Sequence, residues 1–458
     1  MAKLNLCFAL LILASASRSQ VPNTLNPADK IYGLSRFWQE VNYNFVYLNR
    51  IDNAKWDSTY RSMIKEVEET PDDYTYYRSL QKFCAMLKDG HTHIEFPPQI
   101  DSMLMVSMFD NYRVKLKNFN GKAIVYQTSL SAKDLLPLGS EVVEVNHLPT
   151  KMYIEKYVAP YIATSTSYAM EDQCVYNLLE GFKGQTFTIT IKTPQSKLKT
   201  IQLTHGQSGD QKYYPNEQND DKTLDFKWLG HNIAYLGLNS FADPSIVSLF
   251  KEKLPELYKA KSLIIDLRKN GGGNDDFGYA ILQYLTHDKS LNAIRSSTRQ
   301  HLGVFKAWGS DLAPKDTARN ETNKRKYLDA HNEYYYSLPY WPLMITNTGK
   351  KIVVPVVVLM GHNTASAAED FLIATDNQKH IIKMGERSNG STGQPYVFTL
   401  PGGGTAYICT KKDTYFDGRE FVGYGVKPDI EVEQSINDFV KGQDTALIKA
   451  IDYLIKNK

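Results

Sequence analysis

The chain has little cysteine, with four among its 458 residues. Cys7 lies in the N-terminal apolar stretch, and the other three are Cys84, Cys174 and Cys409. Their wide separation excludes a disulfide framework, and none has the spacing of zinc ligands. One pair remains a candidate disulfide outside the cytoplasm, and we expect at least one buried free thiol.

An excess of charge of either sign is also lacking. Lysine and arginine total 53 against 50 acidic residues, a net charge of +3, and no basic run stands out. Composition therefore implies neither nucleic acid nor an anionic membrane as a partner. The glycine run Gly271–Gly273 fits neither the phosphate-loop nor the dinucleotide pattern, so no nucleotide site is indicated.

Long apolar runs are absent too, and this excludes a membrane span. The longest early run, Leu4–Leu13, follows Lys3 and precedes small residues. This order is typical of a secretory signal peptide over residues 1–19, with cleavage after Ala16 or Ser19. We therefore expect an exported protein, periplasmic or extracellular, that begins between Ser17 and Gln20.

The most informative stretch is Val356–Asp376. Val356–Met360 is an unbroken apolar run, as in a strand buried on both faces of a parallel sheet. A helical spacing of apolar residues follows, so Ser366 falls at a helix N-terminus, beside free N–H groups. That position suits a nucleophile whose reaction generates an oxyanion. The simpler alternative is that Ser366 or Thr364 only caps the helix.

The order of predicted elements gives an α/β fold with several units. Helical spacing dominates residues 25–88, strands and hairpins dominate residues 112–204, and a polar linker covers 205–221. Strands then alternate with helices, which predicts parallel strands with crossover helices. The expected units are a signal peptide 1–19, an N-terminal helical region 20–110, a β module 111–205, a core 222–436 and a C-terminal helix 437–458.

Two local expectations concern loops. The third N-terminal helix should stop at Asp89-Gly90, with Gly90 in the left-handed conformation and His91 directly after it. Residues 286–350 read as irregular, with Trp308 and Trp341 among several aromatic residues. We favour a packed insertion there over a loop that lines a cleft.

Five motifs in order carry a resemblance to a known family: DGHT, IDLRKNGGG, TASAAE, GERSNGSTG and GYGVKPDIEV. Together they resemble the tail-specific (C-terminal-processing) serine peptidases, from the N-terminal helices to Val432. The resemblance implies a crotonase-like α/β core and a PDZ-like module at 111–205, which would hold peptide tails. It also implies a peptide or unfolded protein as substrate and neither a metal nor an organic cofactor.

The same resemblance assigns the nucleophile and the oxyanion hole. Ser366 of TASAAE matches the family's nucleophile. The N–H of Ala367, together with that of Gly271 or Gly272, matches the oxyanion hole. Glu369, one helical turn after Ser366, is interpreted mainly as a packing or hydrogen-bonding residue.

The base differs between branches of the family. One branch uses a lysine in the loop that here reads GERSNGSTG, where Ser391 or a close neighbour takes its place. Lys383 and Lys411 lie elsewhere in the pattern, so the dyad is absent. The tricorn-like branch uses a histidine that matches His91 of DGHT. Imidazole is an apt base near neutral pH, and we expect His91 within about 3 Å of Ser366.

Departures from the tricorn-like pattern leave the partner of His91 open. Gly90 stands where those enzymes have a serine, and Val422 stands at the place of the orienting glutamate. Glu420, Glu369 and Asp89 are the candidate orienters. His362, four residues before Ser366, is interpreted as a strand-end residue rather than the base.

The preferred interpretation is an exported serine endopeptidase in which Ser366 forms an acyl-enzyme and His91 is the general base. The rival interpretation is a degenerate member of the family that binds peptides or lipids, as the interphotoreceptor retinoid-binding protein does with the same core. Proximity of Ser366 and His91 would favour the enzyme, and a wide apolar cavity with the two far apart would favour the binder.

Overall fold

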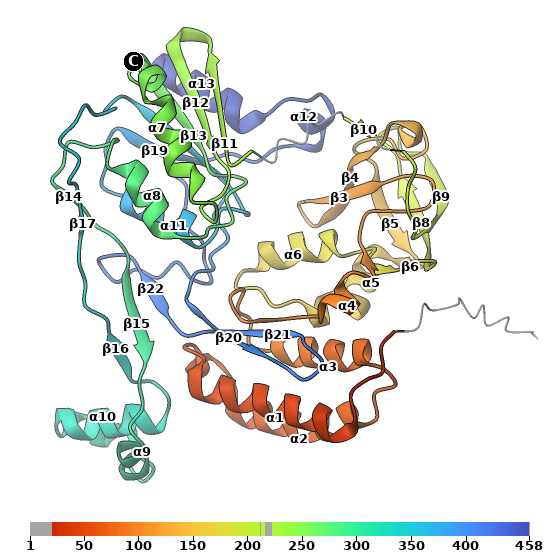
Figure 1. Cartoon of the computed structure of the whole chain (residues 1–458), viewed down its shortest axis with the longest axis vertical. Coiled ribbons are helices and arrows are strands. Elements are labelled where there is room, and N and C mark those ends of the chain that lie inside the picture. The colour runs from red at the N-terminus through yellow and green to blue at the C-terminus, as the bar shows by residue number, and fades with distance from the viewer. Residues whose placement is uncertain (1–20, 211, 216–221, 458) are drawn as a thin grey trace, which may run out of the picture.

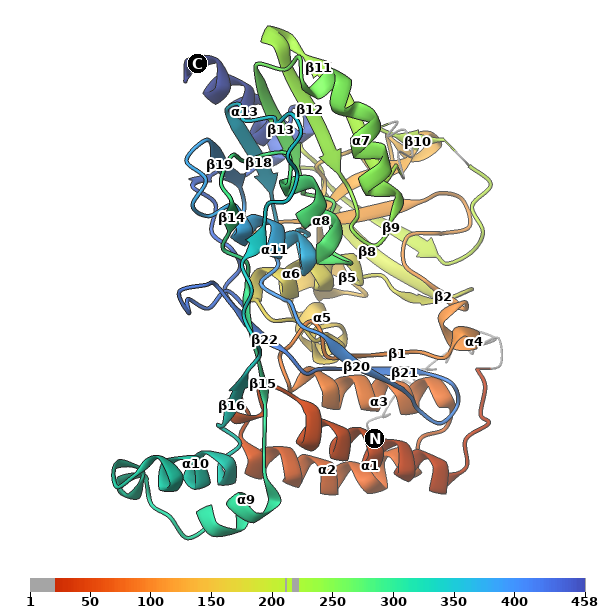
Figure 2. The ribbon, with the colours of Figure 1, turned by 60° about the vertical axis from the view of Figure 1, so that its left-hand side comes forward.

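The computed structural model describes residues 21–210, 212–215 and 222–457 of the chain (Figure 1). The expected signal peptide, residues 1–19, lies outside the described residues. Residues 211 and 216–221 of the expected linker also lie outside them. The chain forms an N-terminal helical layer, a β unit, an α/β core and a projecting arm (Figures 1 and 2).

The helical layer packs against strands from the far end of the sequence. Helices α1 (Pro27–Asn44), α2 (Asn53–Glu68) and α3 (Asp73–Ala85) lie beside the sheet β1-β21-β20 (Figure 2). That sheet joins β1 (His93–Glu95) to the hairpin β20 (Pro395–Thr399) and β21 (Thr405–Cys409). The turn that carries His91 is thereby brought to the C-terminal half of the chain.

The β unit has its own apolar core. Its strands run β10-β4-β5-β8-β9, with β3 and β6 paired at the side. Antiparallel hairpins form around Asn120-Gly121 and around Pro194, in agreement with the strands and hairpins that the sequence predicts over residues 112–204. Its strands and helices are β3 (Val114–Phe119), β4 (Lys122–Ser129), β5 (Glu141–Val145), β6 (Leu148–Pro149), α5 (Thr150–Tyr157), α6 (Ser167–Tyr176), β8 (Thr186–Lys192), β9 (Leu198–Thr204) and β10 (Tyr213–Tyr214).

The core sheet runs β11-β12-β13-β18-β19-β23, parallel except for β11. Strand β18, Val356–Met360, lies inside this sheet between β13 and β19, and all five of its residues are buried. It starts directly after Pro355, as the sequence predicts. The other bounds are β11 (Leu224–Leu229), β12 (Ile233–Leu238), α7 (Ser245–Leu257), β13 (Ser262–Asp266), α8 (Asp275–Leu282), α11 (Ala367–Ala374), β19 (Ile381–Gly385), β23 (Ile430–Glu431) and α13 (Thr445–Lys456).

Alternation along the buried strands explains the two helix layers. Leu263, Ile265 and Val358 pack into the apolar cluster that contains α7, α8 and α11. Ile264 and Val357 point the other way, into a cluster with α13. Successive strand residues face opposite sides, so a strand covered on both faces must be apolar throughout. Helix α11 is therefore fixed on one face with its N-terminus at the carboxyl end of β18.

Residues 286–350 are more regular than the sequence indicates. Strands β15 (Arg295–Arg299) and β16 (Tyr335–Ser337) form a ribbon that projects from the body and carries α9 (Gly303–Gly309) and α10 (Glu321–Ala330) at its tip (Figures 1 and 2). Trp308 and Trp341 are 54% and 80% exposed, so the expected packed insertion is wrong for these residues. The short remaining elements are α4 (Pro98–Asp101), β2 (Leu104–Met105), β7 (Gly181–Phe182), β14 (Ser290–Leu291), β17 (Leu343–Met344), β22 (Lys412–Thr414) and α12 (Ile436–Val440).

Two smaller expectations are also settled. Cys84, Cys174 and Cys409 are all free and buried, so no candidate disulfide forms among them. The left-handed residue after α3 is Lys88, at φ 51°, and not Gly90. Among the described residues, no helix combines the length and apolar character needed to cross a membrane.

Candidate active site

Ser366 occupies a strained turn between β18 and α11. Its φ and ψ are 54° and −125°, outside the regions that a residue with a side chain prefers, which costs about 1–3 kcal/mol. Ser366 is the N-cap residue of α11, where its N–H donates to the Glu369 carboxylate at 3.1 Å, and no hydrogen bond of its hydroxyl is found among the described residues. The Thr364 hydroxyl bonds to the Leu267 carbonyl. Ser366 therefore caps α11 through its backbone and the carboxylate of Glu369, and its hydroxyl is left without a partner in the described part of the chain, whereas Thr364 is tied to the end of β13.

The preceding loop ties this turn to the glycine run. The Ala365 N–H donates to the Asn270 carbonyl at 3.1 Å, and the Asn270 amide donates to the Leu238 carbonyl at 2.9 Å. Gly272, at φ 102°, lies so near that a Cβ on it would be 2.7 Å from the Cβ of Ser366. Only glycine permits this approach, which places the glycine run beside the serine.

The oxyanion hole is expected from the N–H of Ala367 and that of either Gly271 or Gly272, and these three candidate groups differ in whether they already donate a hydrogen bond. The Gly272 N–H donates to the side-chain oxygen of Asn270 at 2.9 Å, so it is occupied. In the described part of the chain, the N–H groups of Ala367 and Gly271 have no acceptor. The available pair is therefore Ala367, at the N-terminus of α11, and Gly271.

His91 is bound by a serine rather than by a carboxylate. Its Nδ1 lies 2.7 Å from Oγ of Ser391, and Ser391 also accepts a hydrogen bond from the Ser366 N–H through its carbonyl. Burial lowers the pKa of His91 to about 4, so the ring is neutral near pH 7. Ser391 thus connects His91 to Ser366, although the sequence indicates only that this residue stands in place of the family's lysine.

Gly90 explains how these two residues come so close. A Cβ at position 90 would lie 2.7 Å from Oγ of Ser391 and 3.3 Å from its Cβ. A larger residue before His91 would collide with Ser391 or displace it. Glycine at position 90 therefore leaves the room that the side chain of Ser391 occupies.

The expected direct hydrogen bond between His91 and Ser366 is not present in this structure. The Nδ1 atom is occupied by Ser391, so Nε2 is the ring nitrogen that remains for another hydrogen bond. Catalytic hydrogen bonds are often long without substrate and tighten in the complex. The correction is that Ser391, and not Ser366, provides the short contact to His91.

Glu369 holds the turn and the Ser391 loop together. Its buried carboxylate accepts from the Ser388 hydroxyl at 2.5 Å and from the N–H groups of Gly390, Ser391 and Ser366 at 2.7, 3.2 and 3.1 Å. Burial raises its pKa to about 7 against the effect of these donors. Glu369 contacts the backbone around the site and not the ring of His91.

The other two candidate orienters also lack a hydrogen bond to His91. Asp89 accepts from the hydroxyls of Thr92 and Ser165, and burial raises its pKa to about 6. Glu420 pairs with Lys412 and, at 3.4 Å, with Arg50. The position of Asp89 and Glu420 in the sequence motifs does not predict which groups they bind. Each carboxylate binds the cation or hydrogen-bond donor that the folded chain brings closest to it.

The alternative bases are engaged elsewhere. His362 bonds through Nδ1 to Asp172 at 2.7 Å, as a strand-end residue rather than a partner of Ser366. Lys383 pairs with Asp376 at 2.9 Å, and Lys411 pairs with Asp413 at 3.1 Å. In the described ranges, no group of three or more histidine, cysteine and acidic side chains is arranged to hold a metal ion.

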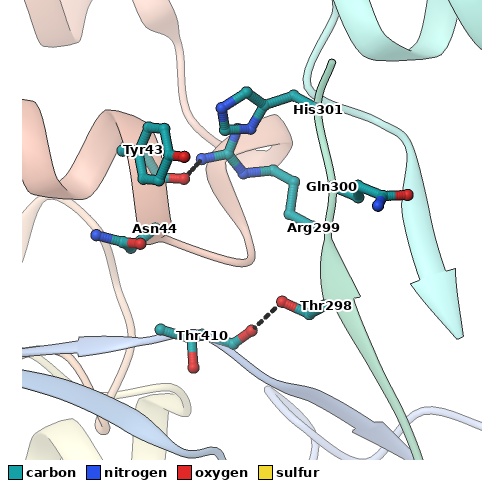
Figure 3. Close-up of a pocket in the computed structure, with 7 residues that line it drawn as sticks. All are labelled: Tyr43, Asn44, Thr298, Arg299, Gln300, His301 and Thr410. Carbon is teal, nitrogen blue, oxygen red and sulfur yellow. Dashed lines mark hydrogen bonds between the residues drawn. The ribbon is translucent and has the colours of Figure 1, made fainter. Parts of the chain in front are cut away.

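A separate pocket lies between the end of α1 and the end of β15 in the projecting arm (Figure 3). It has a volume of about 200 Å³, and its lining includes Tyr43, Arg299 and His301 but not Ser366 or His91. The Arg299 guanidinium donates to the carbonyls of Asn42, Tyr43 and Phe45, so its cation caps the C-terminus of α1. This pocket is polar and does not resemble the wide apolar cavity of a lipid binder.

Comparison with known proteins gives consistent results. Residues 232–432 match the model of peptidase family S41. The carboxyl-terminal-processing protease of Picosynechococcus sp. is 22% identical over 420 residues, which span 90% of this chain and 86% of that protein. The crystal structure of mature CPAF superposes with a TM-score of 0.67 at 16% identity, over 94% of this chain and 98% of that one. A putative peptidase from Parabacteroides merdae gives 0.52 at 18% identity, over 94% and 97%.

Proposed function

We propose that this chain, whose residues 232–432 match the model of peptidase family S41, is an exported serine endopeptidase that cleaves peptides or unstructured protein tails. Ser366 is the nucleophile and forms the acyl-enzyme. His91 is the general base, and Ser391 is its orienting partner.

The observation that carries this proposal is the state of Ser366. Its hydroxyl is unbonded, partly exposed and held by a strained backbone at the N-terminus of α11. Strain of this kind persists only where the surroundings enforce it, and it clusters at functional sites. A residue with a purely structural role would not need this conformation.

The acylation step follows from the arrangement of the groups. Nε2 of His91 takes the proton of the Ser366 hydroxyl while Oγ attacks the scissile carbonyl carbon. The negative charge that develops on the carbonyl oxygen is stabilised by the N–H groups of Ala367 and Gly271. The tetrahedral intermediate then collapses, the C–N bond breaks, and His91 returns the proton to the leaving amine.

Deacylation repeats the sequence with water. His91 removes a proton from water, hydroxide adds to the ester carbonyl, and the Ser366 oxygen leaves and recovers the proton. Ser391 supports both steps because its hydroxyl oxygen accepts a hydrogen bond from Nδ1–H of His91, which keeps that proton on Nδ1 and leaves the lone pair on Nε2. Glu369 maintains the spacing of Ser366 and Ser391.

The substrate class rests on the relative and on the β unit. The similar protein from Picosynechococcus is named a carboxyl-terminal-processing protease, so we propose protein tails as the substrates here. The β unit, Val114–Thr204, acts as a PDZ-like module that shapes the cleft and grips tails weakly by strand addition. Export is proposed from the first 19 residues, and N-terminal sequencing of the mature protein tests it.

A digest of a peptide library by the wild type and by Ser366→Ala tests the function. Mass spectrometry should find new carboxyl termini with the wild type and none above background with the variant. A phosphonylating serine reagent should label Ser366. Cleavage that persists in Ser366→Ala would exclude the proposed nucleophile.

A further inference from the structure

We propose that Tyr168, in the helix inserted in the β unit, is a positioning residue for the catalytic base. With Ser165 and Thr166, just before α6, it fixes the two segments whose contact creates the His91–Ser391 hydrogen bond. These segments are the turn Asp89–His91, called the base turn, and the loop Ser388–Ser391, called the partner loop. The inference rests on the proposed function.

Ser165 holds the base turn. Its hydroxyl oxygen accepts a hydrogen bond from the Gly90 N–H at 3.0 Å, and the hydroxyl lies 3.3 Å from a carboxylate oxygen of Asp89. Asp89 is buried and also binds Thr92 at the other end of the turn. The backbone directly before His91 is therefore bonded to the inserted segment.

Tyr168 and Thr166 hold the partner loop. The Tyr168 hydroxyl donates to the Ser388 carbonyl at 2.6 Å, and the Thr166 hydroxyl donates to the Asn389 carbonyl at 3.0 Å. The fit is close, since a Cβ on Gly425 would lie 2.3 Å from the Tyr168 hydroxyl and 2.5 Å from the Ser388 oxygen. Two consecutive carbonyls of the loop thus depend on one helix end.

Helix α6 is itself anchored on both sides. Asp172 binds His362 of the core at 2.7 Å and accepts from Asn118 of β3 at 2.8 Å. The Tyr168 ring stacks on His362, with the ring centroids 4.4 Å apart. The helix is therefore a rigid link from the β unit to the carboxyl end of β18.

The position of the contacts favours an effect on catalysis over general packing. Ser388 is three residues from Ser391, and Gly90 is adjacent to His91. Loss of either contact changes the relative placement of His91 and Ser391 while the apolar cores remain intact. A misplacement of about 1 Å at a catalytic group can cost on the order of a hundredfold in rate.

Tyr168→Phe removes the hydroxyl and keeps the ring on His362. We expect kcat to fall about tenfold or more with KM changed less than about twofold, because substrate contacts remain while the base is misplaced. Tyr176→Phe is the control, since Tyr176 lies on the same helix and is 60% exposed. It should behave as the wild type.

The pH profile gives a second readout that packing alone would not change. Burial lowers the pKa of His91 to about 4, so activity of the wild type should fall only at low pH. Loosening the partner loop admits water and moves this pKa up towards the ordinary value of about 6.5. The acid limb of kcat/KM should shift upward in Tyr168→Phe, and Ser165→Ala should show a smaller shift in the same direction.

The outcomes separate this inference from the proposed function. Cleavage by Ser366→Ala would overturn the proposed function and this inference with it. An inactive Ser366→Ala, together with wild-type kcat and pH profiles for Tyr168→Phe and Ser165→Ala, would overturn only the inference. A lower Tm with unchanged kcat well below that Tm would show that Tyr168 is merely structural and would overturn it too.

Discussion

Ser366 and the proposed oxyanion groups come from two neighbouring strand ends, whereas His91, the proposed base, is held by segments that lie far apart in the sequence. The nucleophile side uses β13, β18 and the loops directly after them. The base side joins the base turn, the partner loop and the start of α6, and its central contact spans 300 residues. The nucleophile side is rigid by local geometry, and the base side depends on how separate units dock.

This difference separates two kinds of control. Ser366 is held between the buried elements β18 and α11, so its position and its strained backbone depend only on the folding of the core. The base turn belongs to the helical layer, and α6 belongs to the β unit. The His91–Ser391 contact depends on how those units dock, so we expect changes on the base side to alter the rate more than the fold.

His91→Ala should have the largest effect on activity. Removal of a general base lowers turnover by a factor on the order of a hundred or more, while the apolar cores remain. Turnover of a peptide substrate measures this, with thermal unfolding to verify folding. His93→Ala, two residues along on β1, is the matched control and should retain activity; equal losses in both variants would argue against a specific role for His91.

Ser391→Ala should have an intermediate effect. Nδ1 of His91 would lose its oxygen partner, so the ring could take the wrong tautomer or orientation. We expect kcat to fall about tenfold, between His91→Ala and the wild type. Ser58→Ala on α2 is an exposed control, and an unchanged kcat in Ser391→Ala would assign the orienting role elsewhere.

Glu369→Gln should act mainly on stability. The buried carboxylate accepts from four donors, and an amide would place its NH₂ group against some of them. The free energy of unfolding should fall by about 2 kcal/mol. Denaturant unfolding measures this with Glu68→Gln, on the exposed face of α2, for comparison. A neutral result for Glu369→Gln would show that the protonated acid already occupies the site.

The smallest effect compares two inactive variants. Ser366→Gly should be more stable than Ser366→Ala by about 1 kcal/mol, because glycine adopts the conformation at φ 54° without strain. Denaturant midpoints of the two variants measure the difference. A more stable alanine variant would mean that the strain on the nucleophile side is not stored in this residue.

The same division governs what the sequence reveals. Strand β18, the turn at Ser366 and the place of the glycine run follow from contiguous apolar and small-residue patterns. The partner of His91 does not, because Ser391 and His91 meet only after the helical layer docks on β20 and β21. The occupied Gly272 N–H was also hidden, since it depends on how the Asn270 side chain folds back.

Other misses have related physical causes. The sequence predicts that Gly90 ends a helix. In the structure, the lack of a side chain at Gly90 instead allows Ser391 to approach, and Ser391 lies far away in the sequence. The arm, residues 295–337, reads as irregular because its short helices pack mainly on each other and show no clear apolar face. Residue patterns within one segment predict its helices and strands. Which side chains meet at the candidate site depends on contacts between segments, and those patterns do not reveal such contacts.

The most direct test of the central claim is a crystal structure of the protein with Ser366 phosphonylated by an active-site serine reagent. The account predicts Nε2 of His91 within about 3 Å of an oxygen on the adduct or of Ser366 Oγ, and Nδ1 still bonded to Ser391. It also predicts the phosphonyl oxygen at the N–H groups of Ala367 and Gly271. A ring of His91 that stays more than roughly twice that distance from Ser366 would contradict the assignment of the base.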